Sequence, residues 1–136
     1  MPTVQEIERT LFELAPRDLA QSWDNVGLLV GDSKQEVHRV LVALDVTEEV
    51  AVEADKTGAE LIVAHHPVLF IPAKDVTDRT LTGRVLLRLA ERGISSICMH
   101  TNLDAAPGGV NGALAARLGL EEVESLGDEG GMGRMG

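Results

Sequence analysis

The chain has 136 residues, of which 44% are hydrophobic, and a net charge of −10. This length fits one domain with a modest core. The acidic balance would repel a nucleic-acid backbone and an anionic membrane surface, and no apolar run is long enough to span a membrane. The first residues are polar and acidic, unlike a signal peptide, and Cys98, the only cysteine, has no partner for a disulfide within the chain. We therefore expect a cytoplasmic protein without nucleic-acid or membrane partners.

The N-terminal third predicts a helix, a turn and a short strand. Thr3 and Glu6 form a capping-box pattern at the start of an apolar helical repeat, and Pro16 ends that repeat. The segment around Asp24 is typical of a turn, in which Asp24 makes no more than a local turn contact. Residues 26–30 form the short strand.

From residue 39 onward, predicted strands and helices alternate. This rhythm favours an α/β fold with a mainly parallel sheet, right-handed crossovers and helices on both faces. We expect one domain over residues 1–126, followed by a Gly-rich tail over residues 127–136. The predicted strands are 39–44, 60–64 and 94–99, with a candidate fifth strand at 121–126, and the predicted helices are 47–57, 80–92 and 109–118.

Two adjacent histidines follow the apolar run 61–64. Pro67 comes directly after His65 and His66 and favours an extended, broken backbone at this point. In open α/β sheets, ligands bind in the crevice at the carboxyl ends of the strands. Neutral imidazole is the commonest protein metal ligand, so the pair is a candidate metal site. The alternative is that these are capping or solvated residues at a strand end.

Polar residues also follow the neighbouring strands. Asp45 ends one of them, while His100 and then Asp104 follow another. A mixture of nitrogen and oxygen ligands suits Zn²⁺, Mn²⁺, Fe²⁺ or Co²⁺ better than Ca²⁺, and a carboxylate can bridge two cations. Each residue also has a simpler interpretation. Asp45 begins the turn before the next helix, which is the interpretation that we favour, Asp104 lies in a loop turn, and His100 donates to a backbone carbonyl or orients a ligand.

Several runs, taken together, resemble the NIF-three-like family of dinuclear metal-centre proteins, commonly described as GTP cyclohydrolase I type 2 homologues. The resemblance covers nearly the whole chain. It implies that His65, His66 and Asp104 are ligands of two divalent cations. It places His100 beside the site, as a further ligand or as a proton shuttle, and it implies a homo-oligomer, a hexamer in the family. The runs are Trp23-Asp24-Asn25-Val26-Gly27, His65-His66-Pro67, His100-Thr101-Asn102-Leu103-Asp104 and the closing Gly130-Gly131-Met132-Gly133-Arg134.

The chain departs from the family in its length. Family members are much longer, and their second half repeats an α/β unit and supplies a further His and Glu to the site. This sequence has no histidine after Asp104 and corresponds to the N-terminal half. We therefore expect an exposed apolar surface and self-association.

The histidines and carboxylates at the strand ends predict a divalent-metal-binding protein, and the resemblance implies a metal-dependent hydrolase of the cyclohydrolase type. The alternatives are a non-catalytic metal-binding or scaffold protein, and an inactive fragment with an incomplete site. No phosphate-binding Gly-rich loop and no basic cluster selects GTP, so the small-molecule substrate stays unassigned.

Overall fold

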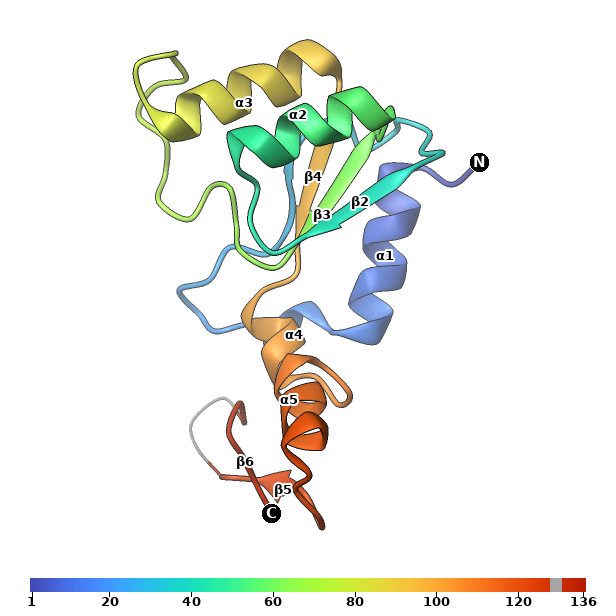
Figure 1. The fold of residues 1–136 in the computed structure, drawn as a ribbon, viewed down its shortest axis with the longest axis vertical. Helices are drawn as coiled ribbons and strands as arrows, with labels where there is room; N and C mark the ends of the chain where they lie inside the picture. Colours follow the sequence, from blue (N-terminus) through green and yellow to red (C-terminus); the bar gives the residue numbers. More distant parts are fainter. Residues whose placement is uncertain (128–130) are drawn as a thin grey trace.

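The computed structural model of the protein, which describes residues 1–127 and 131–136, is built around one four-stranded sheet (Figure 1). Its strands are β1 (Gly27–Val30), β2 (Val40–Ala43), β3 (Leu61–Ala64) and β4 (Ser95–Cys98), in the spatial order β1-β4-β3-β2. The pairs β2–β3 and β3–β4 are parallel, and β1 runs antiparallel to β4. The predicted α/β class with a mainly parallel sheet is confirmed.

The described residues form five α-helices: α1 (Val4–Leu14), α2 (Glu48–Thr57), α3 (Leu81–Arg92), α4 (Thr101–Ala105) and α5 (Val110–Leu118). Of these, α4 and α5 lie beyond the end of the sheet (Figure 1). The described residues include no helix long and apolar enough to cross a membrane. Local chemistry sets the ends of the helices as expected. Thr3, Thr47 and Thr80 accept hydrogen bonds from the first turns of α1, α2 and α3, and Gly58 and Gly93 end α2 and α3 in the left-handed conformation.

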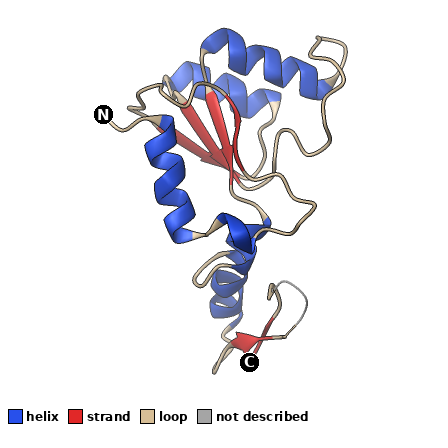
Figure 2. Ribbon diagram, turned by 180° about the vertical axis from the view of Figure 1, so that it is seen from behind, coloured by secondary structure: helices blue, strands red, loops and turns tan. Residues whose placement is uncertain are grey.

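The helices lie on both faces of the sheet, as expected. Helices α2 and α3 cover one face, while α1 packs on the other (Figures 1 and 2). Ile62 packs among the residues under α2 and α3, whereas its neighbour Leu61 packs on the α1 side. The alternation of side chains along β3 therefore gives the sheet two separate apolar layers.

Three features differ from the prediction. Arg17–Leu19 is a short 3₁₀ helix, and residues 101–105 form the helix α4, where we expected only a polar segment after the strand. The candidate strand at 121–126 shrinks to β5 (Glu124–Ser125), which pairs with β6 (Arg134–Met135) outside the main sheet. Part of the predicted tail, residues 128–130, lies outside the described residues.

The face of the sheet that carries α1 is only partly covered. An apolar groove of about 330 Å³ lies between α1, β2 and the start of α5. Two residues that line this groove, Val42 and Leu44, are 78% and 63% exposed. Leu14 and Val110, which also line it, are exposed as well. We call this surface the apolar groove. It is the exposed apolar surface that the sequence led us to expect.

Candidate metal centre at the carboxyl ends of the strands

The chain bends immediately after β3, and this bend positions the histidine pair. The backbone N–H groups of His65 and His66 donate to the carbonyls of Ala43 and Leu44, at 3.3 and 2.9 Å, and so hold the bend against the end of β2. Successive side chains of a regular strand point to opposite faces. Because the strand has ended here, the two imidazole rings come to 5.0 Å between their centroids.

His100 brings a third imidazole to the same place from the end of β4. Its ring centroid lies 5.1 Å from that of His65 and 5.7 Å from that of His66. One ring nitrogen of each histidine lies within 4.8 Å of one from each of the others. The parallel pairing of β3 with β4 explains this convergence, since both strands end at one edge of the sheet. We call these three residues the histidine cluster.

Each histidine of the cluster lies against one carboxylate. His65 Nε2 is 2.8 Å from Oδ1 of Asp104, which α4 supplies. His66 Nδ1 is 2.7 Å from Oδ1 of Asp45, in the bend after β2. His100 Nδ1 is 2.8 Å from an oxygen of a third aspartate, Asp24. The His66 pair is about half exposed, whereas the other two pairs are largely buried.

Asp24 is the functional candidate that the sequence reasoning missed. We expected only a local turn contact, and Asp24 does accept from the N–H of Asn25, but it also binds His100 and Thr101, 76 and 77 residues further along the chain. Burial by itself would raise the pKa of Asp24. Hydrogen bonds from His100, Thr101 and Asn25 outweigh that effect and lower the pKa below its ordinary value. The available signal was its place in the Trp23–Gly27 run.

Asp45 also has a larger role than we favoured from the sequence. It lies in the bend that leads to α2, as a turn residue would, and its carboxylate also holds His66. His38 has the surface position that its polar surroundings suggest, because its side chain is 60% exposed and lies 3.4 Å from Glu60. The structure thus brings together all four predicted site residues, His65, His66, His100 and Asp104.

The donor set of this cluster fits a divalent cation. Imidazole nitrogens and carboxylate oxygens are ligands of Zn²⁺, Mn²⁺, Fe²⁺ and Co²⁺. Ligand atoms bound to one such ion lie roughly 3 Å apart, given bonds of about 2.0–2.2 Å, and the contact of His65 with Asp104 has nearly this length. In addition, His65 Nδ1 is buried and has no hydrogen-bond partner among the described residues. An unpaired buried nitrogen is costly and favours an occupant beside the ring.

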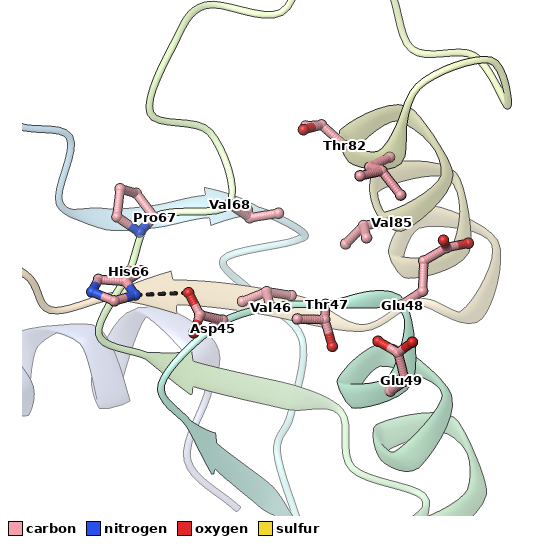
Figure 3. A pocket seen from close by; sticks show the side chains of 11 residues that line it. Asp45, Val46, Thr47, Glu48, Glu49, His66, Pro67, Val68, Thr82 and Val85 are labelled. Carbon is pink, nitrogen blue, oxygen red and sulfur yellow. Dashed lines mark hydrogen bonds and ion pairs between the residues drawn. The ribbon is translucent and has the colours of Figure 1, made fainter.

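A cavity opens beside this cluster, between α2, α3 and the segment after β3 (Figure 3). Its volume is about 430 Å³, within the range of small-molecule sites. His66 and Asp45 bound one end, Val68 and Val85 contribute apolar walls, and Glu48 with Glu49 lies at the other end (Figure 3). A small molecule in this cavity would therefore contact a candidate metal ligand.

The comparisons with solved structures show the same fold in longer proteins. A Bacillus cereus protein described as related to NIF3 superposes with a TM-score of 0.89 at 40% sequence identity, over 93% of this chain and 35% of its own. Reduced HcgD from Methanocaldococcus jannaschii also gives a TM-score of 0.89, at 36% identity, over 98% of this chain and 53% of its own.

Curated relatives give the same result by sequence. A protein from Clostridium perfringens named GTP cyclohydrolase 1 type 2 homolog is 39% identical over 97% of this chain and 52% of its own length. A protein of the same name from Streptomyces coelicolor is 42% identical over 93% of this chain and 44% of its own. The chain thus spans about half the length, or less, of these relatives. The family model described as Duf34/NIF3 (NGG1p interacting factor 3) matches residues 2–136, and the chain belongs to this family.

Proposed function

We propose that this chain binds divalent cations through His65, His66 and Asp104 and acts as a metal-dependent hydrolase on a small molecule. The observation that carries this proposal is the histidine cluster itself, three imidazoles with nitrogens within 4.8 Å of one another, each against an aspartate. Membership of the Duf34/NIF3 family and relatives named as cyclohydrolase homologues support it. We propose two cations of the Zn, Mn, Fe or Co type.

A bound cation would lower the pKa of a water molecule and polarise a bond of the substrate. The residues of this chain would divide the remaining work. His100 lies beside the candidate ligands His65 and His66, and its ring nitrogen is placed to serve as a further ligand or to accept and return a proton. The cavity beside His66 would hold the substrate against the site, with Val68 and Val85 excluding water from one wall.

The apolar groove favours a second role, as a metal-binding protein that works through contacts between subunits. Exposed apolar side chains that gather in one place mark interaction surfaces. The groove is lined by Val42 and Leu44 and reaches His65 and His66, so a subunit bound there would lie next to the site. We propose that a second copy of the chain occupies it in a cytoplasmic homo-oligomer.

Metal content tests the first proposal directly. Gel-filtered protein is analysed by mass spectrometry for metal per chain, with the molar mass read in the same run. We expect wild-type protein to retain metal, and His65→Ala, His66→Ala and Asp104→Ala to lose it while remaining folded by circular dichroism. The matched control is His38→Ala. This histidine precedes β2, at the opposite edge of the sheet from the cluster, and its side chain pairs with Glu60.

Turnover separates the two roles. Hydrolysis of nucleotides or phosphoesters that depends on added metal, and that disappears in Asp104→Ala, supports the hydrolase. Bound metal without such turnover supports the non-catalytic role. Equal metal content in wild type and the three site variants would refute the proposed metal site.

A further inference from the structure

The Asp24 carboxylate is the most completely enclosed charged group beside the histidine cluster. Its side chain is 0% exposed. Oδ1 accepts from the backbone N–H of Asn25 at 2.8 Å and lies 2.8 Å from His100 Nδ1. Oδ2 accepts from the backbone N–H of Thr101 at 3.0 Å and from the Thr101 hydroxyl. Both oxygens are therefore engaged.

These partners fix the direction of the bond to His100. The Thr101 hydroxyl accepts from the backbone N–H of Gln21 at 3.0 Å, so its own hydrogen is free to point to Asp24. The two backbone partners of Asp24 are N–H groups and can only donate. A carboxylate surrounded by three donors acts as an acceptor, so the proton of the fourth bond must be carried by His100 Nδ1.

From this network we infer that Asp24 is a positioning residue, which holds His100 in the Nδ1–H form and thereby presents its Nε2 lone pair to the histidine cluster. Metal-bound histidines commonly donate their other ring N–H to a carboxylate, which fixes the tautomer and the ring orientation. His65 differs, because its Nε2 lies against Asp104, which is itself a candidate ligand, and its Nδ1 has no partner among the described residues. Of the two largely buried pairs, only Asp24–His100 joins the aspartate to Nδ1.

The segment that carries Asp24 also contacts the aromatic residues beside His100. The Asn25 side-chain amide donates to the carbonyl of Leu69, next to Phe70. Phe70 lies edge-on to His100, at 6.2 Å between ring centroids, and Trp23 lies edge-on to Phe70 at 6.0 Å. The His100 ring is thus held by Asp24 through Nδ1 and flanked by an aromatic side chain, which restricts its rotation.

The purpose of this arrangement rests on the proposed metal site, but its geometry can be tested without metal. The experiment is ¹⁵N NMR of the histidine side chains in metal-free wild-type protein. At about pH 8, where an imidazole is ordinarily neutral, we expect His100 to carry its single proton on Nδ1 and none on Nε2. A protonated Nε2 with a bare Nδ1 would overturn the inference, and this measurement on wild type decides the tautomer even if variants fold poorly.

The variant that tests the positioning role is Asp24→Asn. An amide has one oxygen and one NH₂ group in place of the two carboxylate oxygens. The NH₂ group would therefore face existing N–H donors, either those of His100 and Asn25 at the Oδ1 position or that of Thr101 at the Oδ2 position. We expect a mixture of His100 tautomers and a 10- to 100-fold weaker affinity for Zn²⁺, measured by competition with a chelating dye. The matched control Asp45→Asn, in the half-exposed pair with His66, should leave the His100 spectrum unchanged.

An Asp24→Asn protein that is folded, keeps the single Nδ1–H form and binds Zn²⁺ as wild type does would overturn the inference. A different result would separate the two proposals: the protein binds no metal, but wild type has the Nδ1–H form of His100 and Asp24→Asn loses it. That result would refute the proposed function and still support the positioning of His100. The two failures are therefore distinguishable.

Discussion

The two faces of the sheet differ in how far they are covered. On the face under α2 and α3, Ala51, Ala54 and Leu89 are 0% exposed and belong to one apolar layer. On the other face, α1 covers the middle of the sheet but leaves Val42 and Leu44 of the apolar groove exposed. The comparison separates two tasks. The covered face stabilises the fold, and the open face ends at the histidines and leaves an apolar surface exposed.

The largest expected effect concerns Cys98, on the covered face, and its rate of alkylation. In register with Ala64, this thiol lies on the covered side of β4, and its Sγ donates to the His65 carbonyl at 3.1 Å. Burial, with the nearby negative charge of Asp24, raises the pKa of Cys98 from its ordinary 9.0 to about 12. Below pH 9 the thiolate should be about a thousandfold scarcer than in an exposed cysteine, and alkylation correspondingly slow.

The sign of the pH dependence follows from this shift. Because the pKa of Cys98 is raised in the folded state, its contribution to stability is complete below about pH 9 and is lost as the pH rises toward 12. The measurement is the rate of iodoacetamide labelling by mass spectrometry, with the urea-unfolded chain as control. Labelling of native protein as fast as that of the unfolded chain would contradict the covered face as described.

Leu89→Ala tests the packing of the same face. The side chain of Leu89 lies in the layer between α3 and the sheet, and its removal leaves a cavity there. We expect the free energy of unfolding to fall by about 2–5 kcal/mol, measured by urea denaturation. The open-face control, Leu44→Ala, should cost well under half as much at the same low protein concentration, because Leu44 is already solvated. Equal losses would remove the distinction between the faces.

Asn102→Ala tests what anchors α1 to the open face. Asn102 is fully buried, and its side-chain amide donates to the carbonyl of Ala15, at the end of α1, at 2.7 Å. Its Oδ1 accepts from the backbone N–H of His100 at 3.0 Å. The variant leaves both groups unpaired and should lose about 1–3 kcal/mol of unfolding free energy.

The control for this variant is Asn111→Ala. Among the described residues, the Asn111 side chain makes one partly exposed bond, to the carbonyl of Met132, so its removal should cost less than that of Asn102. Thermal unfolding by circular dichroism measures both. A smaller loss in Asn102→Ala than in Asn111→Ala would show that α1 is held by its apolar contacts alone.

The parts of the fold that follow local rules were predictable from the sequence. A threonine that accepts from the first turn and a glycine that ends the last one mark α2 and α3 within a residue of the prediction. The meeting of His65, His66 and His100 was predictable in the same way, because residues that follow parallel strands lie at one edge of the sheet.

The parts that depend on distant contacts were not predictable. Helix α4 has five residues and no apolar repeat, and the buried bonds of Asn102 tie it to α1. Asp24 meets His100 through the tertiary fold and not through local sequence, because 76 residues separate them in the chain. The antiparallel direction of β1 has no local signal either, since strand direction depends on how the connections before and after it run.

Of these variants, Val42→Lys should change the stability of the fold least, and it tests the open face most directly. Val42 is 78% exposed on β2, a terminal strand of the described sheet, so the lysine should change the unfolding free energy by about 1 kcal/mol at most. A lysine on an edge strand opposes pairing with another chain. If a second copy occupies the apolar groove, the molar mass by light scattering should fall to that of one chain.

The matched control for this last variant is Leu81→Lys. Leu81 is 70% exposed at the start of α3, on the covered side of the sheet, so the same charge is added to a similarly exposed apolar residue. A loss of assembly in both variants would mean that added charge, and not the groove, controls association. A wild-type protein that is a single chain at all concentrations would show that the groove does not hold a second copy. If assembly is lost in Val42→Lys alone, the contact between subunits lies in the apolar groove, beside the histidines. Because Val42 is already exposed there, the substitution would disrupt assembly with little effect on the stability of the fold.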